Sequence, residues 1–187
     1  MLSIFIYILL DMKPKVLKEK SNIIKFPMRY LPKMLNKKDN EKQIKMLIKS
    51  KEQYKKGQYY SRDKVASFTS KKSNHVANAR EIYKIENISP TKELVKKTGC
   101  NLETLNMIAR KGEGAYYSSG SRPNQTAQSW GLARLASALT SGKAAAVDYK
   151  IISEGCDHKK KAFILANKAK QKYKKGHSSS KKVAIQI

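Results

Sequence analysis

The sequence predicts a small, mainly α-helical domain with basic flexible tails. Apolar residues recur at helical spacing in several segments, capping residues and glycines separate these segments, and lysine is concentrated toward both ends of the chain. A length of 187 residues leaves room for one domain and its tails. We expect a basic arm over residues 1–36, a helical domain over 37–156 and a basic tail over 157–187.

The arm contains three prolines, which disfavour helix, and an apolar patch at 23–31 that we expect to dock on the body. Residues 1–11 are mostly apolar, but a membrane-spanning helix needs about 20 such residues. They also lack the basic start and small-residue cleavage site of a signal peptide. We favour an extension of the reading frame upstream of Met12 over a short apolar anchor, and expect neither a membrane span nor secretion.

The sequence of the body contains start and stop signals for several successive helices. A capping residue ahead of a helix or a glycine behind it satisfies the free backbone groups at the helix end. Asp39 or Asn40, Ser73, Ser89, Asn101 and Thr126 are the predicted caps. The predicted helices cover residues 38–56, 73–83, 90–98, 101–112 and 126–140, with a short strand or helix at 147–152, a helix near 163–165 and a disordered stretch at 174–182.

The segment Lys92–Ile108 resembles a helix-turn-helix. Gly99 stands at the turn, and the apolar residues on either side have the spacing that turns the inner faces of two helices toward each other. The residues expected to face inward are Leu94, Val95, Cys100, Leu105 and Ile108. Val95 departs from the pattern, which usually has alanine at the close crossing of the two helices.

Two interpretations of this hairpin stay open. As a DNA reader, it would place its second helix in the major groove, with Asn101, Thr104, Asn106 and Arg110 directed outward, because asparagine can pair with adenine and arginine with guanine. Alternatively, it is an αα-hairpin packed on its neighbours, with no groove to read.

A predicted loop, Gly112–Gln125, concentrates glycine, serine and tyrosine ahead of a capped helix. Backbone N–H groups at that helix start could bind a phosphate, Arg122 could add a charged fork, and Tyr116 and Tyr117 could stack on bases. The Gly-Lys-Ser/Thr of a P-loop is missing. A rigid structural loop explains the composition equally well.

The sequence indicates no catalytic, metal or cofactor site. The histidines His75, His158 and His177 have no metal-ligand spacing, and the few acids form no cluster. A nucleophile–base pair would require one of Ser118, Ser119, Ser121 and Cys100 beside His75. We predict a protein that is not an enzyme, with an enzyme built on the Gly112–Thr126 loop as a remote alternative.

The two cysteines, Cys100 and Cys156, lack the CxxC spacing of a zinc site. A disulfide between them is an alternative, but we favour two buried thiols in a reducing compartment.

The net charge of +26, from 40 Lys and Arg against 14 Asp and Glu, indicates a polyanionic partner. Lysine greatly outnumbers arginine, and a lysine is a hydrated point charge that suits phosphate contact better than bidentate base recognition.

Three runs in the second half of the chain form a recognisable set: Gly-Ala-Tyr-Tyr-Ser-Ser-Gly-Ser-Arg-Pro-Asn-Gln-Thr at 114–126, Ser-Trp-Gly-Leu-Ala-Arg at 129–134 and Ser-Gly-Lys-Ala at 141–144. The set resembles an uncharacterised domain family of large DNA viruses of algae and protists, with more distant tailed-phage relatives. The resemblance extends upstream to about Arg29. The resemblance implies a viral origin, but it implies no activity, because the family has none established.

The sequence therefore predicts a viral, basic nucleic-acid-binding protein that contacts mainly the phosphate backbone, with DNA favoured over RNA. The alternative is a virion or scaffold component that binds acidic capsid proteins or packaged DNA. Either role implies a location in the virion or at a viral replication site. The predicted contact residues are Asn101, Thr104, Asn106, Arg110, Lys111, Arg122 and Arg134.

Overall fold

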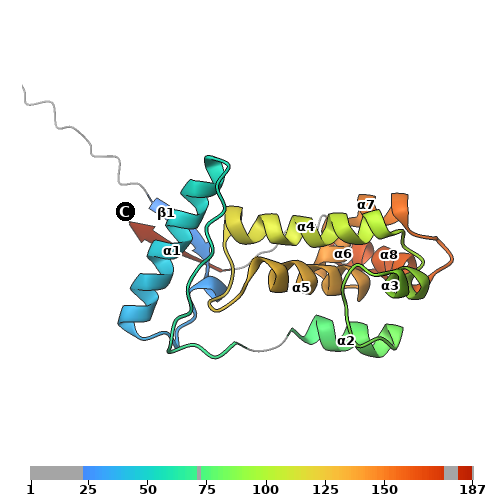
Figure 1. Cartoon of the computed structure of the whole chain (residues 1–187), viewed down its shortest axis with the longest axis horizontal. Coiled ribbons are helices and arrows are strands. Elements are labelled where there is room, and N and C mark those ends of the chain that lie inside the picture. Colours follow the sequence, from blue (N-terminus) through green and yellow to red (C-terminus); the bar gives the residue numbers. More distant parts are fainter. Residues whose placement is uncertain (1–22, 71–72, 175–180, 187) are drawn as a thin grey trace, which may run out of the picture.

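The computed structural model describes residues 23–70, 73–174 and 181–186, and it confirms the mainly α-helical class. Its elements are β1 (Ile23–Pro27), a 3-10 turn (Met28–Tyr30), α1 (Lys37–Lys55), α2 (Asn74–Tyr83), α3 (Lys92–Thr98), α4 (Leu102–Ser119), α5 (Ala127–Leu139), α6 (Lys143–Val147), α7 (Tyr149–Gly155), α8 (Lys161–Tyr173) and β2 (Lys182–Gln186). Helices α4 and α5 run side by side through the middle (Figure 1). Helix α1 and the strands lie at one end, and the other helices gather at the opposite end.

The main hydrophobic core lies where α2, α3, α6, α7 and α8 pack around α4 and α5. Alanines on α5, α6 and α8 are buried there, which lets the helices approach closely. The largest fully buried side chains of this core are Leu94, Leu105, Ile108, Leu135, Leu139 and Ile152. Of the hairpin residues predicted to face inward, Val95 is half-buried and the other four are buried. The α4–α5 pair is therefore the centre of this core.

The contact between α4 and α5 depends on Gly112 and Gly131. A Cβ added at Gly112 would lie 2.6 Å from the Cα of Gly131, so the two backbones touch. The prediction that a helix ends near Gly112 and a loop runs to Gln125 was wrong, because α4 continues to Ser119. Glycine usually marks a helix end, but here it permits a close helix–helix contact inside a helix. The loop is confined to residues 120–125.

Residues 23–36 of the predicted N-terminal arm are part of the fold. Strand β1 pairs with β2 in antiparallel register, with Ile23 opposite Gln186. Phe26, Tyr30 and Leu31 are buried, together with Leu47 of α1, and half-buried Trp130 of α5 packs against them. The apolar patch therefore docks on the body as predicted, but it does so beside a strand contributed by the predicted tail.

Two helices begin at caps other than those predicted. Helix α1 is capped by Asn36, whose side-chain oxygen accepts a hydrogen bond from the backbone N–H of Asp39 at 2.8 Å. Asp39 itself accepts a hydrogen bond from the backbone N–H of Ser67 at 2.7 Å. Helix α3 is capped by Thr91 and not by Ser89. Several residues able to cap stand close together at both places, so composition alone did not select among them.

The C-terminal part of the chain contributes more to the fold than its charge suggested. Residues 149–155 form α7, and Ala162, Ala166 and Ala169 of α8 are buried in the main core. Most of the stretch predicted to be disordered lies outside the described residues, as do residues 1–11. No helix in the described ranges is long and apolar enough to cross a membrane.

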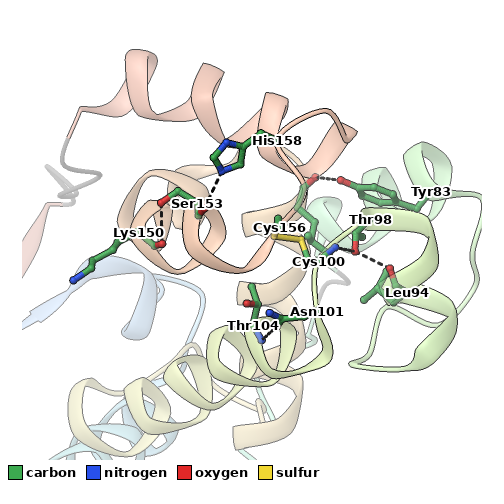
Figure 2. The surroundings of a disulfide bond; sticks show 11 residues. Tyr83, Leu94, Thr98, Cys100, Asn101, Thr104, Lys150, Ser153, Cys156 and His158 are labelled. Atoms are coloured by element: carbon green, nitrogen blue, oxygen red, sulfur yellow. Dashed lines mark hydrogen bonds between the residues drawn. A yellow bond between two sulfur atoms is a disulfide. The ribbon is translucent and has the colours of Figure 1, made fainter.

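Cys100 and Cys156 form a disulfide, so the prediction of two thiols was wrong (Figure 2). The bond joins the turn ahead of α4 to the residue that follows α7, where the two cysteines also form an antiparallel bridge. The backbone N–H of Asn101 donates to the oxygen of Gly155 at 2.8 Å, and that of Asp157 donates to the oxygen of Gly99 at 2.9 Å. The return of α7 onto the hairpin creates this contact, and spacing along the sequence does not reveal it.

Candidate nucleic-acid interface

Two of the predicted contact residues, Asn101 and Thr104, have structural roles at the start of α4. The side-chain oxygen of Asn101 accepts a hydrogen bond from the backbone N–H of Thr104 at 2.7 Å, which caps the helix as predicted. The Thr104 side chain is buried against Gly155, and a Cβ added at Gly155 would collide with the Thr104 hydroxyl. Figure 2 shows Asn101 and Thr104 at the start of the helix. The buried Thr104 side chain is therefore unavailable to a base, whereas Asn101 is exposed but uses its side-chain oxygen for the cap.

Further along α4, the exposure of the predicted residues differs. Asn106 is half-buried, whereas Arg110 and Lys111 are exposed one after the other. The ammonium group of Lys111 lies 2.7 Å from a carboxylate oxygen of Asp148. The Lys111 side chain keeps 47% of its surface exposed, so it can contact solvent while it pairs with Asp148.

Arg134, on α5, is committed to the same carboxylate. Its Nε donates to one oxygen of Asp148 at 2.7 Å and a terminal nitrogen donates to the other at 2.8 Å. The Asp148 side chain is fully buried, and such a carboxylate is stable only when it is paired and hydrogen-bonded. Two cations share one acid, so the cluster of Lys111, Arg134 and Asp148 keeps a net positive charge.

The loop at 120–125 uses most of its polar groups internally. Asn124, at a positive φ of 58°, accepts a hydrogen bond from the backbone N–H of Val65 at 2.8 Å and donates to the oxygens of Val65 and Phe68. Thr126 and Ser129 form a reciprocal capping box at the start of α5. The side chain of Arg122 is exposed. These contacts favour the structural interpretation of the loop, with Arg122 as its one outward cation.

Arg62, which sequence analysis did not single out, joins the segment after α1 to α4. Its guanidinium lies 3.6 Å from the centre of the Tyr116 ring and donates to Ser50 Oγ, Tyr116 O and Ser121 Oγ at 2.8 to 3.0 Å. Burial lowers the pKa of Arg62 below its ordinary value. The contacts join residues 12 to 59 positions apart, so no local sequence signal could have found them.

Tyr116, the ring that Arg62 covers, is the first of a row of four tyrosine rings. The ring centre of Tyr117 lies 5.0 Å from that of Tyr116 and 5.0 Å from that of Tyr59, and Tyr54 lies 6.1 Å from Tyr59. Tyr59 is 70% exposed although two neighbouring rings flank it. Tyr116, predicted to stack on bases, is instead buried, and Tyr117 is half-buried.

Beside this row runs a shallow groove of about 550 Å³ between α1, α4 and α7. Its sides carry polar and apolar groups, and its floor is made of small residues of α4. The lining residues are Tyr54, Met107, Arg110, Lys111, Gly114, Ala115, Ser118 and Ile151. Of the seven predicted contact residues, Arg110 and Lys111 line this groove, and Arg134 meets Lys111 at Asp148. The other four do not line the groove.

The surface charge remains largely uncompensated. Within the described ranges, salt bridges engage only three cations, Lys111, Arg134 and Lys150. Helix α1 carries a dense row of lysines: Lys37, Lys38, Lys42, Lys45, Lys49, Lys51 and Lys55. Such a surface has a positive electrostatic potential, which attracts phosphate groups.

A catalytic arrangement around His75 is not assembled. His75 lies beside Thr140, with its Nδ1 3.3 Å from the Thr140 hydroxyl, and Cys100 is in the disulfide. Ser121 instead contacts Arg62, and Ser118 and Ser119 contact each other. Among residues 23–70, 73–174 and 181–186, no group of three or more His, Cys, Asp and Glu is placed to hold a metal ion.

Residues 27–161 match a family described as a family of unknown function, DUF5824. The chain belongs to this family. The DUF5824 match begins in β1 and ends at the first residue of α8, so it includes the whole α4–α5 pair and most of the main hydrophobic core, but not the buried alanines of α8. It includes the groove and all seven predicted contact residues. No curated protein and no solved structure matches the chain.

Proposed function

We propose that this protein binds nucleic acid, mainly through the phosphate backbone and largely without sequence preference. The observation that carries the proposal is the charge of the surface. The chain has 40 Lys and Arg, and the described residues pair only three of them with carboxylates. Phosphate contacts would release counterions from the polyanion, and this release supplies most of the binding free energy of proteins of this kind.

The geometry of α4 supports backbone contact over base reading. A specific reader presents several polar side chains near the start of its recognition helix. Here Asn101 caps the helix and Thr104 is buried, while a half-buried Asn106 and an exposed Arg110 remain. We therefore favour Arg110, Lys111 and Arg122, with the lysines of α1, as the phosphate-contacting groups.

The proposal includes a viral origin and a location in the virion or at a replication site. Its support is the motif set at 114–144, which resembles proteins of large DNA viruses. Quantitative proteomics of purified particles tests the location. Amounts comparable to those of capsid proteins would favour the structural alternative, in which the basic surface contacts packaged DNA or acidic capsid proteins.

The decisive experiment is a fluorescence anisotropy titration of two unrelated labelled duplexes over a salt series. We expect equal affinities for both duplexes and a steep linear fall of log K with log salt, since the slope is about −0.9 for each phosphate contacted. Failure to bind either duplex at about 0.15 M salt would overturn the proposal. A strong preference for one duplex would replace backbone binding with specific recognition.

A further inference from the structure

We propose that the groove between α1, α4 and α7 is a site for single-stranded nucleic acid, with a base stacked on Tyr59 and phosphates beside Arg110 and Lys111. The inference rests on the proposed nucleic-acid binding and adds to it the kind of strand and the site. It is carried by the tyrosine row, the small-residue floor of the groove and the two adjacent cations.

Tyr59 has the properties of a stacking platform. Its ring is 70% exposed, yet it packs at a tilt against Tyr117 and Tyr54, at centre distances of 5.0 and 6.1 Å. Tyr117 in turn packs edge-on against Tyr116, which Arg62 covers. An exposed ring that is already held in position loses little side-chain entropy when a base stacks on it.

The floor of the groove leaves room for a strand. Gly114, Ala115 and Ser118 lie on one face of α4, and none has a side chain larger than a hydroxymethyl group. A Cβ added at Gly114 would have only the Tyr54 hydroxyl within reach, at 3.7 Å. Met107 and Ile151 border the groove with apolar surface, which favours the faces of bases over hydrated groups.

The charges of the groove complement a phosphate chain. Arg110 and Lys111 contribute two cations, and the residues that line the groove include no acid. Lys111 also contacts Asp148, but that carboxylate is fully buried and already bound in bidentate fashion by Arg134. A duplex keeps its bases stacked inside, so the tyrosines would reach only an unpaired strand.

The test compares binding of an oligodeoxythymidine of about ten nucleotides with binding of a duplex of about ten base pairs to the full chain. The variants are Tyr59→Ala, Tyr59→Phe, Arg110→Ala and, as a matched removal of one exposed cation on α3, Lys96→Ala. Thermal unfolding of each variant verifies that it is folded.

We expect Tyr59→Ala to weaken oligodeoxythymidine binding about tenfold while duplex binding changes less than about twofold. Tyr59→Phe should keep most of the affinity, because the ring remains. Arg110→Ala should reduce the salt slope for the oligonucleotide by about 0.7, and Lys96→Ala should leave it unchanged.

Two results would overturn the inference in distinguishable ways. If the unmodified protein binds both probes but Tyr59→Ala weakens neither, or weakens both equally, the single-strand site is wrong and the general binding stands. If the unmodified protein binds neither probe, the proposed function itself fails and this site fails with it.

Discussion

Arg134 of α5 binds both carboxylate oxygens of Asp148, the residue between α6 and α7, at 2.7 and 2.8 Å. The sequence suggested a surface cation at position 134, but the structure makes this arginine a partner of a fully buried acid. A buried carboxylate without its partners is costly, and so are the cations left behind when it is removed.

Asp148→Asn should therefore lower the free energy of unfolding by roughly 3 kcal/mol. Urea denaturation followed by circular dichroism measures the loss. The matched control is Glu154→Gln, which removes an exposed carboxylate 3.8 Å from Lys150 and should cost less than about 1 kcal/mol. Equal losses in the two variants would contradict the assignment of Asp148 as a structural ion-pair centre.

Gly131→Ala should destabilise the protein by roughly 1–3 kcal/mol, because its Cβ would lie 2.8 Å from the backbone oxygen of Ala109. Gly114→Ala is the control within the same helix pair, since its nearest neighbour would be the Tyr54 hydroxyl at 3.7 Å. The control should be neutral or should stabilise the helix by about 0.5–1 kcal/mol. Thermal unfolding distinguishes the two, and a stabilising effect at position 131 would rule out the close contact.

The local features of this fold were the predictable ones. The helix starts at Asn101 and Thr126 and the inward residues of the hairpin were recognised because capping and periodicity are properties of neighbouring residues. Helix α2 also begins after Ser73 as predicted, but the Ser73 side chain makes no capping hydrogen bond. What could not be predicted joins distant segments. The disulfide, the Gly112–Gly131 contact and the pairing of β1 with β2 depend on how helices pack, and no alternation or spacing encodes them.

The same distinction between local features and contacts of distant segments applies to the candidate site. Arg110 was predicted as an outward residue of an expected helix and Lys111 as a basic contact residue, and both line the groove. Thr104 and Arg134 were assigned outward because they are polar, whereas one is buried against Gly155 and the other is paired with Asp148. Polarity indicates a need for hydrogen bonds but does not tell whether water or the protein supplies them.

Arg62→Lys should lower the melting temperature measurably, although it keeps the charge. An ammonium group cannot reproduce the guanidinium fork that reaches Ser50, Tyr116 and Ser121 together. Differential scanning calorimetry measures the shift, with the exposed Arg122→Lys as control. Indistinguishable melting temperatures for the two variants would show that the Arg62 contacts contribute nothing to stability.

His75 should make stability fall as the solution is acidified. Burial lowers the pKa of this histidine in the folded protein, whereas the unfolded chain keeps an ordinary value near 6.5. Below about pH 6.5 the unfolded state takes up a proton that the folded state resists, so stability decreases until the pH reaches the lowered folded pKa and the loss then levels off. Denaturant unfolding between about pH 7.5 and 5.5 should show a weaker pH dependence in His75→Gln, and an unchanged dependence would contradict this origin.

Reduction of the Cys100–Cys156 disulfide should destabilise the protein by about 4 kcal/mol, because the bond closes a loop over a sequence separation of 56 residues. Denaturant unfolding with and without dithiothreitol measures the effect. The double variant Cys100→Ala/Cys156→Ala should not respond to the reductant. Alkylation of both cysteines in the untreated, denatured protein would show that the bond is not formed.

The pairing of β1 with β2 has a consequence for synthesis. Ribosomes deliver a chain from its N-terminal side, so β1 emerges long before β2, the last element described. Phe26, Tyr30 and Leu31 can pack on α1 as soon as that helix is made, but the backbone N–H and C=O groups that β1 directs toward β2 have no strand partner until β2 itself is made. The two-stranded ribbon can therefore form only after all eight described helices have been synthesised.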